Sequence, residues 1–140
     1  MLAVILLRAL ATNPPPKLKT SCTQPAIALS TATQKQHHTV RWSVTGPGGS
    51  TFELTLGVSR VDVDPGGQFV FVPEPGGSQK TEQRAGHQQT MPNSCKRSGS
   101  FGVLVPPGKY TVRMFQLSGP ITSPTVTEVA SAPLTVTPQH

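Results

Sequence analysis

Apolar and polar residues alternate along two stretches in the first half of the chain. The first, 39–45, places Val40, Trp42 and Val44 on one side and hydroxyl or charged residues on the other. The second, 51–58, carries four apolar residues in the same phase. Alternation with a period of two predicts half-buried β-strands, because successive side chains of a strand point to opposite faces.

A Gly-Pro-Gly-Gly loop at 46–49 separates these two stretches. A short loop of turn-forming residues between two strands is typical of an antiparallel hairpin, so we expect the two to pair. In that hairpin Arg41 and Glu53 lie across from each other on the outer side, where they can form an ion pair.

Further strand patterns are separated by turn signals, at 25–31, 68–73, 101–105, 110–115 and 131–138. Helical periodicity is not seen beyond the opening apolar run. About seven short strands of this kind predict an all-β fold, a Greek-key β-sandwich of antiparallel strands.

The segment 74–99 differs from the rest, since Met91 is almost its only apolar residue. It is too long for an ordinary connection between strands. We predict a polar insertion in the domain, either partly ordered and tethered by Cys95 or disordered.

Three places in the chain carry a resemblance to a known family. Trp42 lies in "TVRWSV", Leu104, Pro106 and Tyr110 have the spacing of a corner between two strands, and "SAPLTVTP" has the form of a last strand. From 25 to 138 the chain resembles an immunoglobulin-like or fibronectin type III-like domain.

The resemblance implies structural core and corner roles for Trp42, Leu104, Pro106 and Tyr110, with the tyrosine hydroxyl bonded to nearby backbone. The chain departs from the family in its polar insertion and in the placement of its cysteines. The resemblance says little about function, because sandwiches carry unrelated activities.

Composition adds a surplus of positive charge. The chain has 140 residues, 12 Lys and Arg, only 6 Asp and Glu, and a formal net charge of +6. The cations are dispersed and no aromatic residues interleave with them, so we expect no specific nucleic-acid binding. Net charge alone favours attraction to an anionic polysaccharide or cell-wall polymer. The predicted contacts for such a ligand are the basic residues of the polar segment, Lys80, Arg84, Lys96 and Arg97.

The first 24 residues are interpreted as a secretory signal, truncated at its start, followed by a Pro-rich lead-in. The alternative is an N-terminal strand or short helix that packs on the domain. No stretch is long enough for a transmembrane segment. In a secreted or cell-surface protein, Cys22 and Cys95 are expected to form one disulfide, the alternative being two unrelated buried thiols.

Candidate metal sites are weak. Neighbouring strand residues such as His37 and His38 point to opposite faces, so one metal is not expected to bind both, and His87 stands apart. Asp62 and Asp64 adjoin a glycine turn but lack further calcium ligands. We therefore predict no metal and no cofactor.

Candidate catalytic residues are also few. The six acids include no convincing buried pair, and no nucleophile motif occurs, so we predict that the protein is not an enzyme. The expected function is a non-catalytic, secreted or cell-surface module with a structural, adhesive or ligand-binding role, whose partner is an anionic polymer or another protein. Two alternatives remain open: a carbohydrate-binding accessory module with exposed aromatics, and a copper-binding cupredoxin-like protein.

Overall fold

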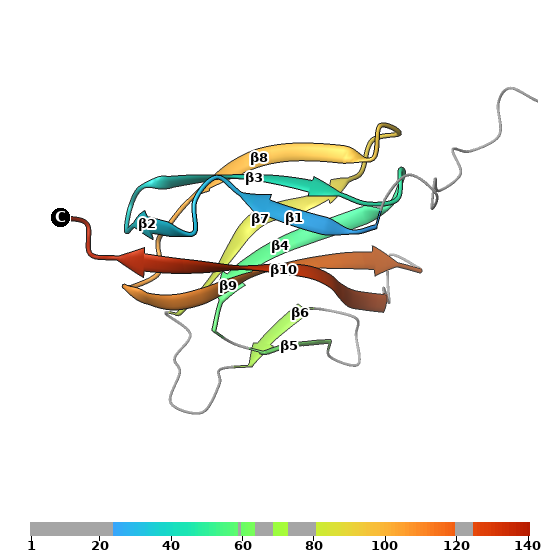
Figure 1. Cartoon of the computed structure of the whole chain (residues 1–140). Coiled ribbons are helices and arrows are strands. Elements are labelled where there is room, and N and C mark those ends of the chain that lie inside the picture. Colours follow the sequence, from blue (N-terminus) through green and yellow to red (C-terminus); the bar gives the residue numbers. More distant parts are fainter. Residues whose placement is uncertain (1–23, 59, 64–68, 73–80, 120–124) are drawn as a thin grey trace, which may run out of the picture.

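The computed structural model describes residues 24–58, 60–63, 69–72, 81–119 and 125–140, and it describes no side chains in 60–63, 69–72 or 86–87. The regular elements of these residues are β-strands (Figure 1). The strands are β1 (Ala26–Leu29), β2 (Thr33–Lys35), β3 (Thr39–Thr45), β4 (Thr51–Gly57), β5 (Arg60–Val63), β6 (Phe69–Val72), β7 (Glu82–Thr90), β8 (Lys96–Gly102), β9 (Gly108–Ser118) and β10 (Thr125–Thr137).

Two sheets pack against each other. One has three strands in the order β1-β3-β8, and the other has five in the order β2-β10-β9-β4-β7. The pairs are antiparallel except β2 with β10, which is parallel. A separate two-stranded ladder, β5-β6, lies beside the larger sheet in Figure 1. The prediction of an all-β sandwich is confirmed at this level.

The predicted hairpin between 39–45 and 51–58 is wrong. β3 pairs with β1 and β8, whereas β4 pairs with β7 and β9, so the loop between them crosses from one sheet to the other. Gly49 has a φ of 85°, a conformation that glycine adopts without steric cost. Its N–H donates to the Met91 carbonyl at 2.7 Å, which fixes the crossing loop to the turn after β7.

The predicted polar insertion at 74–99 is also wrong for its described part. Residues 82–90 form β7 and residues 96–102 form β8, and each strand is the edge of one of the two sheets. An edge strand needs few inward apolar residues, and in this stretch the buried ones are Ala85, Met91, Cys95 and Phe101. The sparse apolar pattern therefore marks edge strands of the sandwich rather than an insertion.

Side chains join these two edge strands where no backbone ladder does. The Gln83 amide donates to the Gly102 carbonyl at 2.6 Å and accepts from the Leu104 N–H at 2.7 Å. Further along, Arg97 donates to the Gln89 side chain and, at 3.2 Å, to the Thr90 carbonyl. The sandwich is thus held together along this side by polar bonds from one sheet to the other.

The core lies between the sheets, and Trp42 is central to it. Its indole meets Phe52 of the other sheet edge-on, with ring centroids 6.1 Å apart and an interplanar angle of 83°. Trp42 of β3 lies directly opposite Gly99 of β8 in the antiparallel pairing. A Cβ at Gly99 would lie 2.5 Å from the indole ring, so the ring occupies the space that a side chain there would need.

The corner before β9 has the expected tyrosine contact. Tyr110 is 6% exposed, and its hydroxyl donates to the backbone carbonyl of Pro106. Burial raises the pKa of this hydroxyl above its ordinary value of 10.0. The core role predicted for Leu104 is wrong, because this residue is 64% exposed and lies outside the core. Val103 and Val105 are buried instead, and strand alternation then turns the residue between them outward.

Replacement of Gly99 by alanine tests the Trp42 contact. We expect Gly99→Ala to lower the free energy of unfolding by about 1–3 kcal/mol, because the new methyl group overpacks the indole. Gly102→Ala is the matched control on the same strand, since a Cβ there meets nothing within 4 Å. Urea denaturation of both variants checks the prediction, and equal stability of the two would contradict it.

Replacement of Tyr110 by phenylalanine tests the corner. We expect Tyr110→Phe to lower the free energy of unfolding by about 1 kcal/mol at neutral pH, because the hydroxyl bond to Pro106 is lost. Above pH 10 the difference in unfolding free energy between wild type and the variant becomes smaller. The reason is that Tyr110 loses its proton in the unfolded chain, whereas in the folded protein its raised pKa keeps it protonated. Denaturation at pH 8 and pH 11 measures both effects. No gap at pH 8, or a wider gap at pH 11, would refute the account.

Candidate functional site

The outward face of the three-stranded sheet is exposed. Register places Lys96 beside Thr45, Ser98 beside Ser43, and Ser100 beside Arg41, all on the side away from the core. On β1 the exposed positions are Ala26 and Ala28, which pair with Thr45 and Ser43. Small side chains thus cover this face, and Arg41 and Lys96 project from it.

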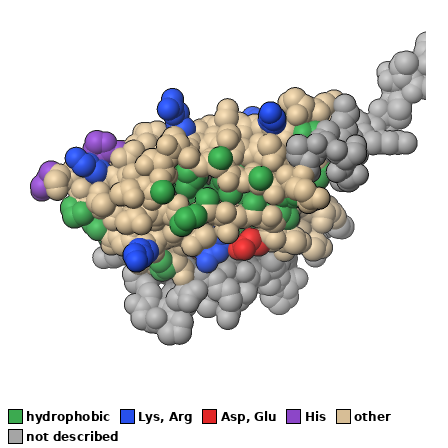
Figure 2. All heavy atoms as spheres, in the orientation of Figure 1, with side chains coloured by type: hydrophobic (Ala, Val, Ile, Leu, Met, Phe, Trp, Pro, Cys, Tyr) green, Lys and Arg blue, Asp and Glu red, His purple; other side chains and the backbone are tan. Residues whose placement is uncertain are grey.

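This face carries positive charge only. β1, β3 and β8 contain Arg41, Lys96 and Arg97 but no Asp or Glu. Arg41 and Lys96 have no ion-pair partner among the residues that the structure describes. In Figure 2 blue side chains project from the upper margin of the molecule, where β3 and β8 lie in the same view, and no red side chain lies among them.

The outward face of the five-stranded sheet is charged differently. The acidic side chains that the structure describes, Glu53, Glu82 and Glu128, are all on its strands. Arg84 pairs with Glu53 at 3.3 Å, and the Glu53 side chain is only 5% exposed. The prediction that Glu53 pairs with Arg41 is therefore wrong, because the two lie in different sheets.

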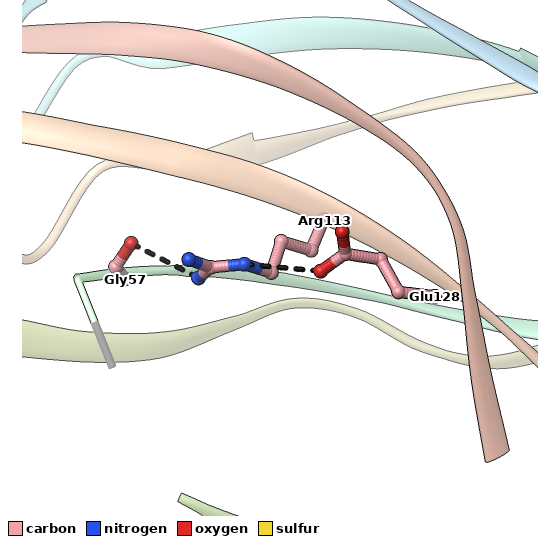
Figure 3. A network of polar contacts seen from close by, with 3 residues as sticks. All are labelled: Gly57, Arg113 and Glu128. Atoms are coloured by element: carbon pink, nitrogen blue, oxygen red, sulfur yellow. Dashed lines mark hydrogen bonds and ion pairs between the residues drawn. The ribbon is translucent and has the colours of Figure 1, made fainter. Parts of the chain in front are cut away.

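A second ion pair lies on the same face (Figure 3). The Arg113 Nε is 3.2 Å from the Glu128 carboxylate, and its Nη1 donates to the Gly57 carbonyl at 3.5 Å. Arg113 of β9 thus connects β10 on one side with the end of β4 on the other. On this sheet Arg84 and Arg113 are paired with glutamates, and Glu82, Lys35 and Lys109 add charges of both signs, whereas the strands of the smaller sheet carry cations without acids.

The four predicted anion-binding residues do not form one cluster. Lys80 lies outside the described residues, and Arg84 is paired with Glu53. Arg97 is opposite Val44 in the register, so it points to the core side, where it bonds to β7. Lys96 is the one of these four that the structure places exposed on the positive face. Arg41 was missed, although its outward position in β3 is visible in the alternation.

The aromatic side chains that the structure describes are all buried. Besides Trp42, Phe52, Phe101 and Tyr110, this includes Phe115, which is 4% exposed. A carbohydrate-binding platform of stacked rings needs exposed aromatic faces. These residues therefore do not supply one.

Residues considered for metal or redox chemistry lie apart. His37 and His38 are exposed in the turn before β3, and the His87 side chain is outside the described set. Within the described ranges, no three His, Cys, Asp or Glu side chains come close enough to hold a metal ion. Cys95 is buried and is not a free thiol, whereas Cys22 lies outside the described residues, as do the predicted signal segment up to residue 23 and Asp64.

The described residues contain no helix that could span a membrane.

Comparisons with known proteins leave the family open. No protein-family model matches the chain, and no curated protein matches it significantly. Among solved structures, the chain is similar to the crystal structure of Spo0M, a sporulation control protein from Bacillus subtilis, with a TM-score of 0.33 and 13% identity. The alignment covers 81% of this chain and 48% of that chain, so this chain spans about half the length of that protein.

Proposed function

We propose that this protein is a non-catalytic, secreted or cell-surface β-sandwich module that binds an anionic polysaccharide or cell-wall polymer. The observation that carries the proposal is the separation of charge between the two sheets. One sheet has cations without acids, and the described acids of the other include two that are paired with arginine. An unbalanced cationic face attracts polyanions through their summed charge.

The fold within this proposal is immunoglobulin-like or fibronectin type III-like. Three features support it: the division of strands into β1-β3-β8 and β2-β10-β9-β4-β7, the parallel pairing of β2 with β10, and the Tyr110 contact with Pro106 at the corner. The fold supplies the scaffold only, and the charge on its surface supplies the argument for a ligand.

The extracellular location and the Cys22–Cys95 disulfide belong to the same proposal. The N-terminal apolar run followed by Ala-Leu-Ala supports export, and the absence of a free thiol at Cys95 agrees with a bridge. Such a bridge would tie the segment before β1 to the turn between β7 and β8. Mass spectrometry of the native protein before and after reduction measures it directly.

Retention on immobilised polysaccharides tests the ligand. At low salt we expect the protein to be retained on polygalacturonate and on dextran sulfate and to pass through neutral dextran. Retention on the acidic columns should fall steeply between 50 and 300 mM NaCl, about the range in which screening shortens the Debye length to below 10 Å. The neutral polymer is the control for non-specific adsorption. Passage through both acidic columns at low salt would remove the ligand from the proposal, whereas equal retention on neutral dextran would show that charge does not determine binding.

A further inference from the structure

The outward face of β1, β3 and β8 offers a defined set of groups to a ligand. Ser43 and Ser98 lie opposite each other at its centre. Arg41 and Ser100 lie toward one end, and Lys96 lies toward the other. Arg41 is four residues from Thr45, the position that pairs with Lys96. At about 3.3 Å per residue and about 4.8 Å between strands, the Cα atoms of Arg41 and Lys96 are about 14 Å apart.

Each group on this face has a function that suits an acidic sugar polymer. The two cations can pair with carboxylates or sulfates at separate points along a chain. The serine hydroxyls of the same face can donate to, or accept from, sugar hydroxyls. Ala26, Ala28 and Gly102 have small side chains or none, so they leave room for an extended polymer along the surface.

The chemistry of this face also argues against single-stranded nucleic acid as the ligand. Proteins that bind single strands stack bases on aromatic side chains. Positions 26–29, 39–45 and 96–102 contain two aromatic residues, Trp42 and Phe101, and both point into the core. The cations and hydroxyls therefore favour a polymer recognised through charge and hydrogen bonds.

We infer that the outward face of the three-stranded sheet, with Arg41 and Lys96 as charged contacts and Ser43, Ser98 and Ser100 as hydroxyl contacts, is the binding surface for an extended acidic polysaccharide. This inference rests on the proposed function and gives its site. It moves the ligand from the polar segment predicted from the sequence to a sheet face, which keeps only Lys96 of the earlier residues.

Paired charge-removal variants test the surface. Arg41→Ala with Lys96→Ala removes two cations from the face, and Lys35→Ala with Lys109→Ala removes two exposed cations from the larger sheet. Binding of wild type and both double variants to polygalacturonate, dextran sulfate and single-stranded DNA is measured at one salt concentration. Because all four side chains are exposed, both variants are expected to keep the wild-type melting temperature.

We expect the Arg41/Lys96 variant to bind the acidic polysaccharides about tenfold or more weakly, and the Lys35/Lys109 variant less than about twofold more weakly. Equal weakening by both variants would overturn the inference, because net charge would then explain the binding. Tighter binding of DNA than of either polysaccharide would also overturn it. If the Arg41/Lys96 variant binds the acidic polysaccharides as tightly as wild type does, the proposed surface is wrong but the proposed function stands. If wild type binds no acidic polymer, the proposed surface and the proposed function are both wrong. The ratio between the two polysaccharides separates carboxylate from sulfate recognition.

Discussion

The contact between Trp42 and the bare backbone of Gly99 is the constraint on which the rest of the structure depends. The indole can lie against β8 only because Gly99 has no side chain, and from there its ring reaches Phe52 in the opposite sheet. This contact commits one side of β3 to the core. Since side chains alternate, it equally commits Arg41 and Ser43 to the outside, and so the core determines which residues form the positive face.

The two long sides of the sandwich are closed by different means. On one side the chain itself changes sheets between β1 and β2, and Ser30 and Ala32 bond to strands of different sheets, β3 and β10. On the other side, Gln83 and Arg97 join the edge strands by side-chain bonds. Because Arg97 uses its Nε and Nη1 to bond to β7, fewer of its N–H groups remain for a ligand, and charge counted along the sequence overestimates the binding surface.

Much of the fold could be predicted from the sequence, and the errors have physical reasons. The alternation of apolar and polar residues located β3, β4 and β9. Two successive strands show the same alternation whether they pair in one sheet or lie in two facing sheets, so the pattern could not exclude a hairpin across 46–49. Edge strands bury few residues, so β7 and β8 resembled an insertion. At the corner, the family resemblance assigned a core or corner role to Leu104, whereas strand alternation buries Val103 and Val105 and exposes Leu104.

The site was less predictable, because a sheet face brings together residues that are distant in the chain. Arg41 and Lys96 are 55 positions apart and come to the same sheet face only through the β3–β8 register. The account as a whole requires that Trp42 be sealed between the sheets. Quenching of its fluorescence by iodide and by neutral acrylamide tests this directly, since the chain has a single tryptophan. The account predicts much weaker quenching in the native protein than in urea by both agents, and native quenching as strong as in the unfolded chain would contradict it.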